Sequence, residues 1–114
     1  MQLRIKKLTD IDTMSMWRQG DLLIQTTDSI PENLKKQKAL TLLASRISGH
    51  SHSIAEKRTC RIYQDGDEWY LDVFAETASL VHPEHGTIDL AEGKYRVWRQ
   101  REFGSNGVNR FVLD

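Results

Sequence analysis

Apolar and polar residues alternate over short stretches of this chain, and turn residues separate the stretches at close intervals. The clearest case is a pair of β-prone segments, 59–64 and 68–74, on either side of Asp65-Gly66-Asp67. An Asp-Gly pair between two such segments predicts a β-hairpin. Apolar side chains occupy both faces of 68–74, so this strand is expected to be covered on both sides.

Similar signals predict the other strands. These are 22–26 after the turn Gly20-Asp21, 78–82, 87–90, 94–103 after the turn 91–93, and 111–113 after the turn 104–107. Six to nine short strands at such spacing indicate an all-β fold, either a small barrel or a sandwich. We expect a single β-rich domain over 1–114, with 1–13 as a peripheral N-terminal segment.

Residues 34–47 allow two interpretations. Leu40, Leu43, Ala44 and Ile47 have the spacing of one helix face, which favours a helix. The apolar run 40–43 also suits a short buried strand. The residue pattern leaves both structures open.

Composition limits the classes of function. With 39% hydrophobic and 28% charged residues, the chain resembles soluble globular proteins and differs from disordered ones. The 16 basic and 16 acidic residues balance, which disfavours nucleic acid and anionic membranes as partners, although Arg96, Arg99 and Arg101 lie close together. Cys60 is the one cysteine, so no intrachain disulfide is expected. Because no apolar run suits a membrane span or a signal peptide, we expect a cytoplasmic protein.

The candidate chemistry lies in the histidines. All four occur as two tight pairs, His50-Ser51-His52 and His82-Pro83-Glu84-His85. In an extended segment His50 and His52 would share a face, and a turn at 83–84 would bring His82 and His85 to one side together with Glu84. If the two segments are neighbours in the sheet, three or four imidazoles converge. The sequence therefore predicts a divalent-metal site with ligands His50, His52, His82, His85 and Glu84.

Imidazole with a carboxylate suits Zn, Fe(II), Mn or Ni, and nothing in the sequence selects among these ions. Metal-activated water or oxygen chemistry would follow if the protein is an enzyme, which stays open. A competing hypothesis is a non-enzymatic module that binds a protein partner or a second copy of itself. In that case the histidines are structural, forming a pH-sensitive hydrogen-bonded cluster, and a sheet edge or the strand Arg96–Arg101 binds the partner.

Four motifs occur in order: WRQGDLLI at 17–24, SGHSHSI at 48–54, HPEHG at 82–86 and GKYRVWRQREF at 93–103. This set, spanning roughly 16–103, resembles a family of small uncharacterised proteins from bacteria, including cyanobacteria and actinobacteria, and from phages. The resemblance implies a β-rich domain with a strand near 40–48. It implies no activity.

The order of the histidines is also similar to that of cupins, which are metal-binding β-barrels. That resemblance implies that His50 and His52 are ligands, with His82 or His85 as the distal histidine. Glu56 follows His52 by four positions, near the place of the cupin glutamate, and would be a supplementary ligand or base. The Pro-x-Gly of the second cupin motif does not precede His82.

Overall fold

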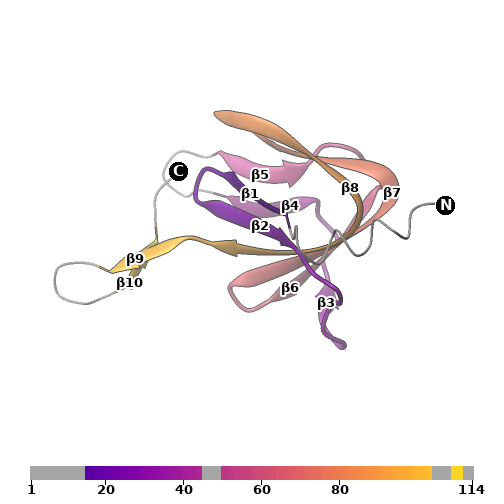
Figure 1. The fold of residues 1–114 in the computed structure, drawn as a ribbon, viewed down its shortest axis with the longest axis horizontal. Helices are drawn as coiled ribbons and strands as arrows, with labels where there is room; N and C mark the ends of the chain where they lie inside the picture. The colour runs from indigo at the N-terminus through magenta and orange to yellow at the C-terminus, as the bar shows by residue number, and fades with distance from the viewer. Residues whose placement is uncertain (1–14, 45–49, 104–108, 112–114) are drawn as a thin grey trace.

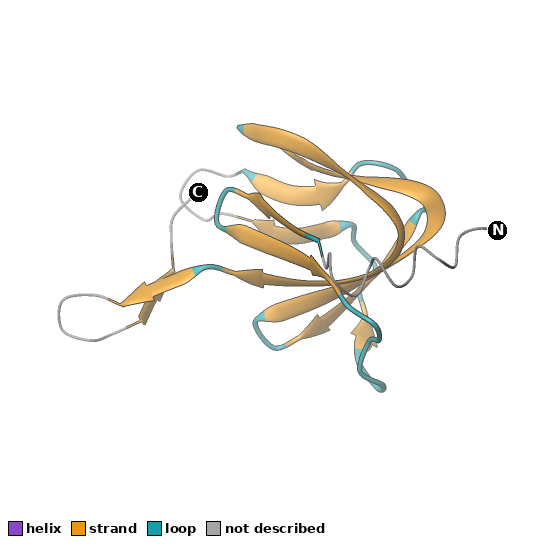
Figure 2. Cartoon of the chain, viewed as in Figure 1, coloured by secondary structure: helices purple, strands orange, loops and turns teal. Residues whose placement is uncertain are grey.

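The computed structural model describes residues 15–44, 50–103 and 109–111, which form strands and connecting turns without a helix (Figure 1, Figure 2). The strands are β1 (Met16–Gln19), β2 (Leu22–Thr26), β3 (Lys35–Lys36), β4 (Thr41–Ala44), β5 (Ser51–Ile54), β6 (Cys60–Asp65), β7 (Glu68–His82), β8 (His85–Arg99), β9 (Arg101–Phe103) and β10 (Asn109–Phe111). The predicted all-β class is confirmed.

The main sheet is antiparallel and has the order β1-β2-β8-β7-β5-β4, with β6 beside β7 and β3 beside β6. It curls into half of a barrel (Figure 1). The long strand β7 pairs with β6 over its first half, from Glu68 to Val73, and with β5 near its end, at Leu80 and Val81. Its pairing with β8 shifts register between Val73 and Thr77. Such an irregularity bends a strand, which accounts for the change of partner there.

Two predicted boundaries inside β7 and β8 are wrong. The segments 68–74 and 78–82 are one continuous strand, and the expected turn at 91–93 lies within β8. Gly93 pairs with Val73 at the point where the pairing of β7 and β8 becomes irregular, and its φ of +153° is a conformation that glycine adopts easily. Regular pairing of the two strands begins again at Thr77 and Ala91. The hairpin thus bends without ending.

The segment 34–47 contains strands where the residue spacing favoured a helix. Lys35–Lys36 pair with β6, and Thr41–Ala44 pair with β5. The strand implied by the family resemblance is therefore present, although 45–49 lie outside the described residues. The peripheral segment 1–13 and the turn 104–107 also lie outside them, and of the predicted strand 111–113 only Phe111 is described, at the end of β10.

The turn Gly66-Asp67 closes the predicted hairpin, since Asp65 pairs with Glu68. Gly66 has a φ of +63°, the left-handed conformation that such a two-residue turn requires. The expectation that both faces of 68–74 are covered is wrong. Trp69 is buried, whereas Phe74 on the opposite face is 41% exposed.

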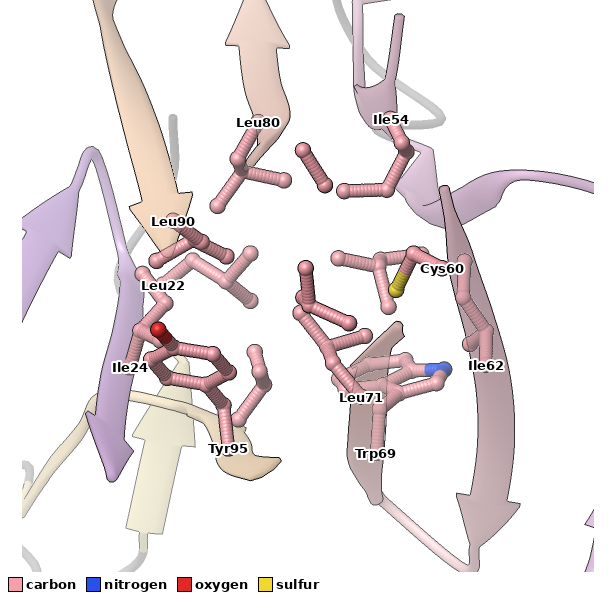
Figure 3. Packing of buried hydrophobic residues seen from close by; sticks show 14 residues of the cluster. Leu22, Ile24, Ile54, Cys60, Ile62, Trp69, Leu71, Leu80, Leu90 and Tyr95 are labelled. Carbon is pink, nitrogen blue, oxygen red and sulfur yellow. The ribbon is translucent and has the colours of Figure 1, made fainter. Parts of the chain in front are cut away.

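The core lies on the concave face of the curled sheet (Figure 3). It consists of Leu22, Ile24, Leu42, Ile54, Cys60, Ile62, Trp69, Leu71, Val73, Ala78, Leu80, Leu90, Tyr95 and Val97. In the regular parts of β2, β6, β7 and β8 these are alternate residues, as strand geometry requires. Ile54 on β5 and Leu80 on β7 lie at the edge of this apolar cluster, and the residues beyond them on the same face are histidines.

Candidate functional site

The two histidine segments lie next to each other at one end of the concave face. His52 is two residues before Ile54 and His82 is two residues after Leu80, so both continue the inward-facing rows of their strands. Ser53 pairs with Val81, a register that sets His52 beside His82. His82 in turn pairs with His85 across the two-residue turn Pro83-Glu84. The two segments are therefore neighbours in the sheet, which is the condition under which the imidazoles were expected to converge.

All four imidazoles belong to one cluster, in which His82 contacts the other three rings. Its centroid lies 4.3 Å from that of His52, 4.5 Å from that of His85 and 5.7 Å from that of His50. The rings of His52 and His85 are nearly parallel, with centroids 6.4 Å apart. His52 and His82 are buried, at 1% and 6% exposure, whereas His50 and His85 are half-buried. The cluster therefore has a buried floor and a more accessible rim.

Glu84, the predicted carboxylate ligand, lies on this rim. Its Oε1 is 3.2 Å from Nδ1 of His50. Its backbone N–H donates a hydrogen bond of 3.0 Å to Nδ1 of His82. Both contacts come from the tight turn between β7 and β8, which places the carboxylate beside the imidazoles.

As they stand, the imidazole rings pack against one another. Within the part of the chain that the structure describes, no three His, Cys, Asp or Glu side chains form a group arranged to hold a metal ion. The structure brings the predicted ligands together, but it does not give them the geometry of a preformed metal centre.

Gln19, at the end of β1, holds the floor of the cluster. Its Nε2 donates to the backbone oxygens of Leu80 and Gly86, at 2.9 and 2.8 Å, and its Oε1 lies 2.9 Å from Nδ1 of His52. The side chain is 1% exposed. One carboxamide therefore connects the edge strand β1 with β7, β8 and β5 across the concave face.

Asp21, in the turn between β1 and β2, is the second buried group. Its Oδ1 lies 3.6 Å from Nε2 of His52, and its Oδ2 accepts a hydrogen bond of 2.8 Å from Nε of Arg99. The Asp21 side chain has no exposed surface. A charged carboxylate at this depth needs cationic partners, and the guanidinium of Arg99 is one of them.

The sequence interpretation missed both Gln19 and Asp21. They flank Gly20 within the motif WRQGD, where the sequence predicted only a turn at Gly20-Asp21. Gln19 shares a face with Trp17 by strand alternation, and Trp17 packs against the core. That alternation is the signal that could have indicated an inward-facing amide.

Glu56 and Cys60 lie away from this chemistry. The carboxylate of Glu56 accepts hydrogen bonds of 2.9 and 2.7 Å from the backbone N–H and the hydroxyl of Ser79, which lies on the opposite face of β7 from Leu80. The supplementary role implied by the cupin resemblance is thus at odds with its position. Burial raises the pKa of the Cys60 thiol to about 12, which argues against a thiolate nucleophile there.

The arginines of β8 have carboxylate partners. Arg96 forms two hydrogen bonds of 2.9 Å with Glu68 and stacks 4.4 Å over the ring of Trp98. Arg99 pairs with Asp21. Paired guanidinium groups have less attraction for phosphates, in keeping with the neutral charge of the chain.

A surface cavity of about 370 Å³ lies elsewhere, lined by Leu23, Asp67, Glu68, Trp98, Arg99 and Gln100. No histidine lines it. We place the candidate site at the histidine cluster because the groups that can bind a metal or transfer a proton gather there.

Among the described residues, no helix is long and apolar enough to cross a membrane.

Fold and site together define a small all-β domain whose curled antiparallel sheet encloses a cluster of four histidines at one end. The chain belongs to the family described as domain of unknown function (DUF8820), whose model matches residues 18–100. This range contains Gln19, Asp21, both histidine pairs and Arg99, and therefore the whole cluster. No curated protein and no solved structure matches the chain, and the cupin resemblance has no support from these comparisons.

Proposed function

We propose that this domain binds one divalent transition-metal ion at the histidine cluster. The observation that carries the proposal is that all four histidines of the chain, three from the strands β5, β7 and β8 and His50 from just before β5, meet at one end of the concave face. Imidazole is the commonest protein ligand for zinc, nickel, copper and iron, and carboxylates complete many such sites. The candidate ligands are His50, His52, His82 and His85, with Glu84 at the rim.

The spacing of the rings suits this role even though their orientation must change. Zinc–nitrogen bonds of about 2.0–2.1 Å in a tetrahedral site put the centroids of two ligating imidazoles roughly 5 Å apart. The observed separations within the cluster, 4.3–6.4 Å, lie on either side of that value. Rotation of the His50, His82 and His85 side chains, without movement of the strands, would then aim their nitrogens at one ion, and for His82 it would break the hydrogen bond from the Glu84 N–H. The half-buried His50 and His85 have the most room to rotate.

Metal content and stability test the proposal. Untagged protein, purified without chelators, is analysed by ICP-MS, and its thermal unfolding is followed with and without Zn, Ni, Mn and Fe(II). We expect close to one ion per chain, or a clear rise in Tm with at least one ion. Replacing both rim histidines, in His50→Ala/His85→Ala, should weaken zinc binding at least tenfold.

Two carboxylate variants supply a matched control. Glu84→Gln should weaken binding, whereas Glu92→Gln, at an exposed position on β8, should leave it unchanged. A protein that contains no metal and gains no thermal stability from any of the four ions would contradict the proposal. The histidines would then serve only to hold the end of the sheet together.

A further inference from the structure

The carboxamide of Gln19 has one favourable orientation. Its Nε2 donates to two backbone oxygens, those of Leu80 and Gly86. Carbonyl oxygens only accept hydrogen bonds, so a flipped amide would place its own oxygen against both of them. Oε1 must therefore be the atom that faces Nδ1 of His52, at 2.9 Å.

This orientation decides that Nδ1 of His52 carries a proton. An amide oxygen can only accept, so Nδ1 of His52 is the donor. In the neutral ring the lone pair then resides on Nε2. That atom faces Oδ1 of Asp21 at 3.6 Å.

A lone pair and a carboxylate oxygen at this distance suit a shared cation. A histidine nitrogen at about 2.0–2.1 Å and a carboxylate oxygen at about 2.0–2.2 Å from a tetrahedral zinc ion lie roughly 3.3–3.5 Å from each other. The 3.6 Å between Nε2 of His52 and Oδ1 of Asp21 is slightly longer than that range. Arg99 donates to the other carboxylate oxygen, Oδ2, so Oδ1 is the oxygen that faces His52.

We propose that Gln19 is a positioning residue that fixes the Nδ1–H form of His52, so that Nε2 of His52 and Oδ1 of Asp21 form the buried half of the metal site. The inference rests on the proposed metal-binding function and adds Asp21 to the ligands. Metal-binding histidines usually donate their other ring N–H to an oxygen acceptor, which fixes the tautomer and the direction of the ring. Gln19 has that relation to His52.

The first test reads the tautomer directly in metal-free protein. Long-range ¹H–¹⁵N correlation spectra distinguish an Nδ1–H ring, an Nε2–H ring and a doubly protonated ring. They are recorded at about pH 9, well above the ordinary histidine pKa. We expect Nδ1–H for His52. An Nε2–H ring, or a ring still doubly protonated at this pH, would overturn the inference.

The second test uses Gln19→Met, with Gln25→Met on β2 as the matched control. Gln19→Met should lose the single His52 tautomer and bind zinc about 10–100-fold more weakly, the usual effect of removing such a partner. Asp21→Asn should also weaken zinc binding, by at least tenfold. Gln25→Met should behave as the unmodified protein in both measurements.

The outcomes separate this inference from the proposed function. One outcome is that the unmodified protein binds zinc while the Kd values of Gln19→Met and Asp21→Asn for zinc both lie within threefold of its own. In that case the metal site exists but does not use these residues. If the unmodified protein binds none of the four ions, the proposed function and the ligand role of Asp21 both fail. An Nδ1–H signal in that protein would still support the positioning of His52 by Gln19.

Discussion

Gln19→Met should lower the free energy of unfolding of the metal-free protein by about 3 kcal/mol. The change removes three hydrogen bonds from a side chain that is 1% exposed. Each buried group left without a partner costs about 1–3 kcal/mol, with carbonyls near the lower end because they have a second lone pair. The more apolar methionine side chain offsets about 1 kcal/mol of the loss.

The measurement is urea unfolding in the presence of a chelator, followed by tryptophan fluorescence. Gln25→Met is the control and should stay within about 0.5 kcal/mol of the unmodified protein, since Gln25 lies on the opposite face of β2 from the buried Ile24. A loss below about 1 kcal/mol for Gln19→Met would refute the reasoning, because it would mean that the three groups find other partners. A loss near 3 kcal/mol leaves a domain of ordinary stability folded.

Three further effects are expected. Burial raises the pKa of the Cys60 thiol to about 12. At pH 8 this thiol should therefore react with a thiol reagent at least 100-fold more slowly in the folded protein than in the urea-unfolded protein. Equal rates would show that the thiol is accessible. The backbone N–H and then the hydroxyl of Ser79 lower the pKa of Glu56, so its contribution to stability is present above the unfolded pKa and is lost as pH falls through the lower folded value. Urea midpoints between pH 2 and 6 should therefore depend less on pH in Glu56→Gln, and an unchanged profile would contradict this assignment. Gly66→Ala should destabilise the protein by about 1 kcal/mol in urea unfolding, because the φ of Gly66 is +63°. As a control, Gly86→Ala has open space around the added carbon and should change the stability by less than about 0.5 kcal/mol. Equal losses in the two variants would argue against backbone strain at Gly66.

The local parts of this fold were predictable from sequence. Asp65-Gly66-Asp67 between two β-prone segments predicted a hairpin because a two-residue turn constrains its own backbone. Likewise, a His-x-His segment in a strand sets both rings on one face, and the turn at 83–84 brings His82 beside His85. These relations depend on residues only a few positions apart.

The extent of β7 and β8 was not predictable in the same way. The polar segment Ala75-Glu76-Thr77 and the Gly93 region look like turns, yet both lie inside long strands. The register of β7 against β8 shifts between Val73 and Thr77, and the two strands continue to pair on both sides of this shift. Whether such a segment ends a strand depends on its partner strand, which local residue patterns do not specify.

The buried half of the candidate site depends on longer-range structure still. Gln19 reaches the backbone of Leu80 and Gly86, which are 61 and 67 positions away, and Asp21 meets Arg99 across 78 positions. These contacts exist only because the sheet curls and brings its edge strand β1 across the concave face. The histidine pairs were visible in the sequence as a pattern, whereas their buried partners are defined by the curl.

The same curl explains why a metal at this position would act on the whole domain. Gln19 and Asp21 come from β1 and the turn after it, and His52 and His82 come from β5 and β7, near the other edge of the main sheet. An ion bound between His52 and Asp21 would therefore connect segments that the strand order separates. Ligand binding to the folded state adds about 2.7 kcal/mol at a hundredfold excess over Kd. On the proposed function, zinc should then protect the backbone amides of both edges from hydrogen exchange together, because opening either edge would break the same site.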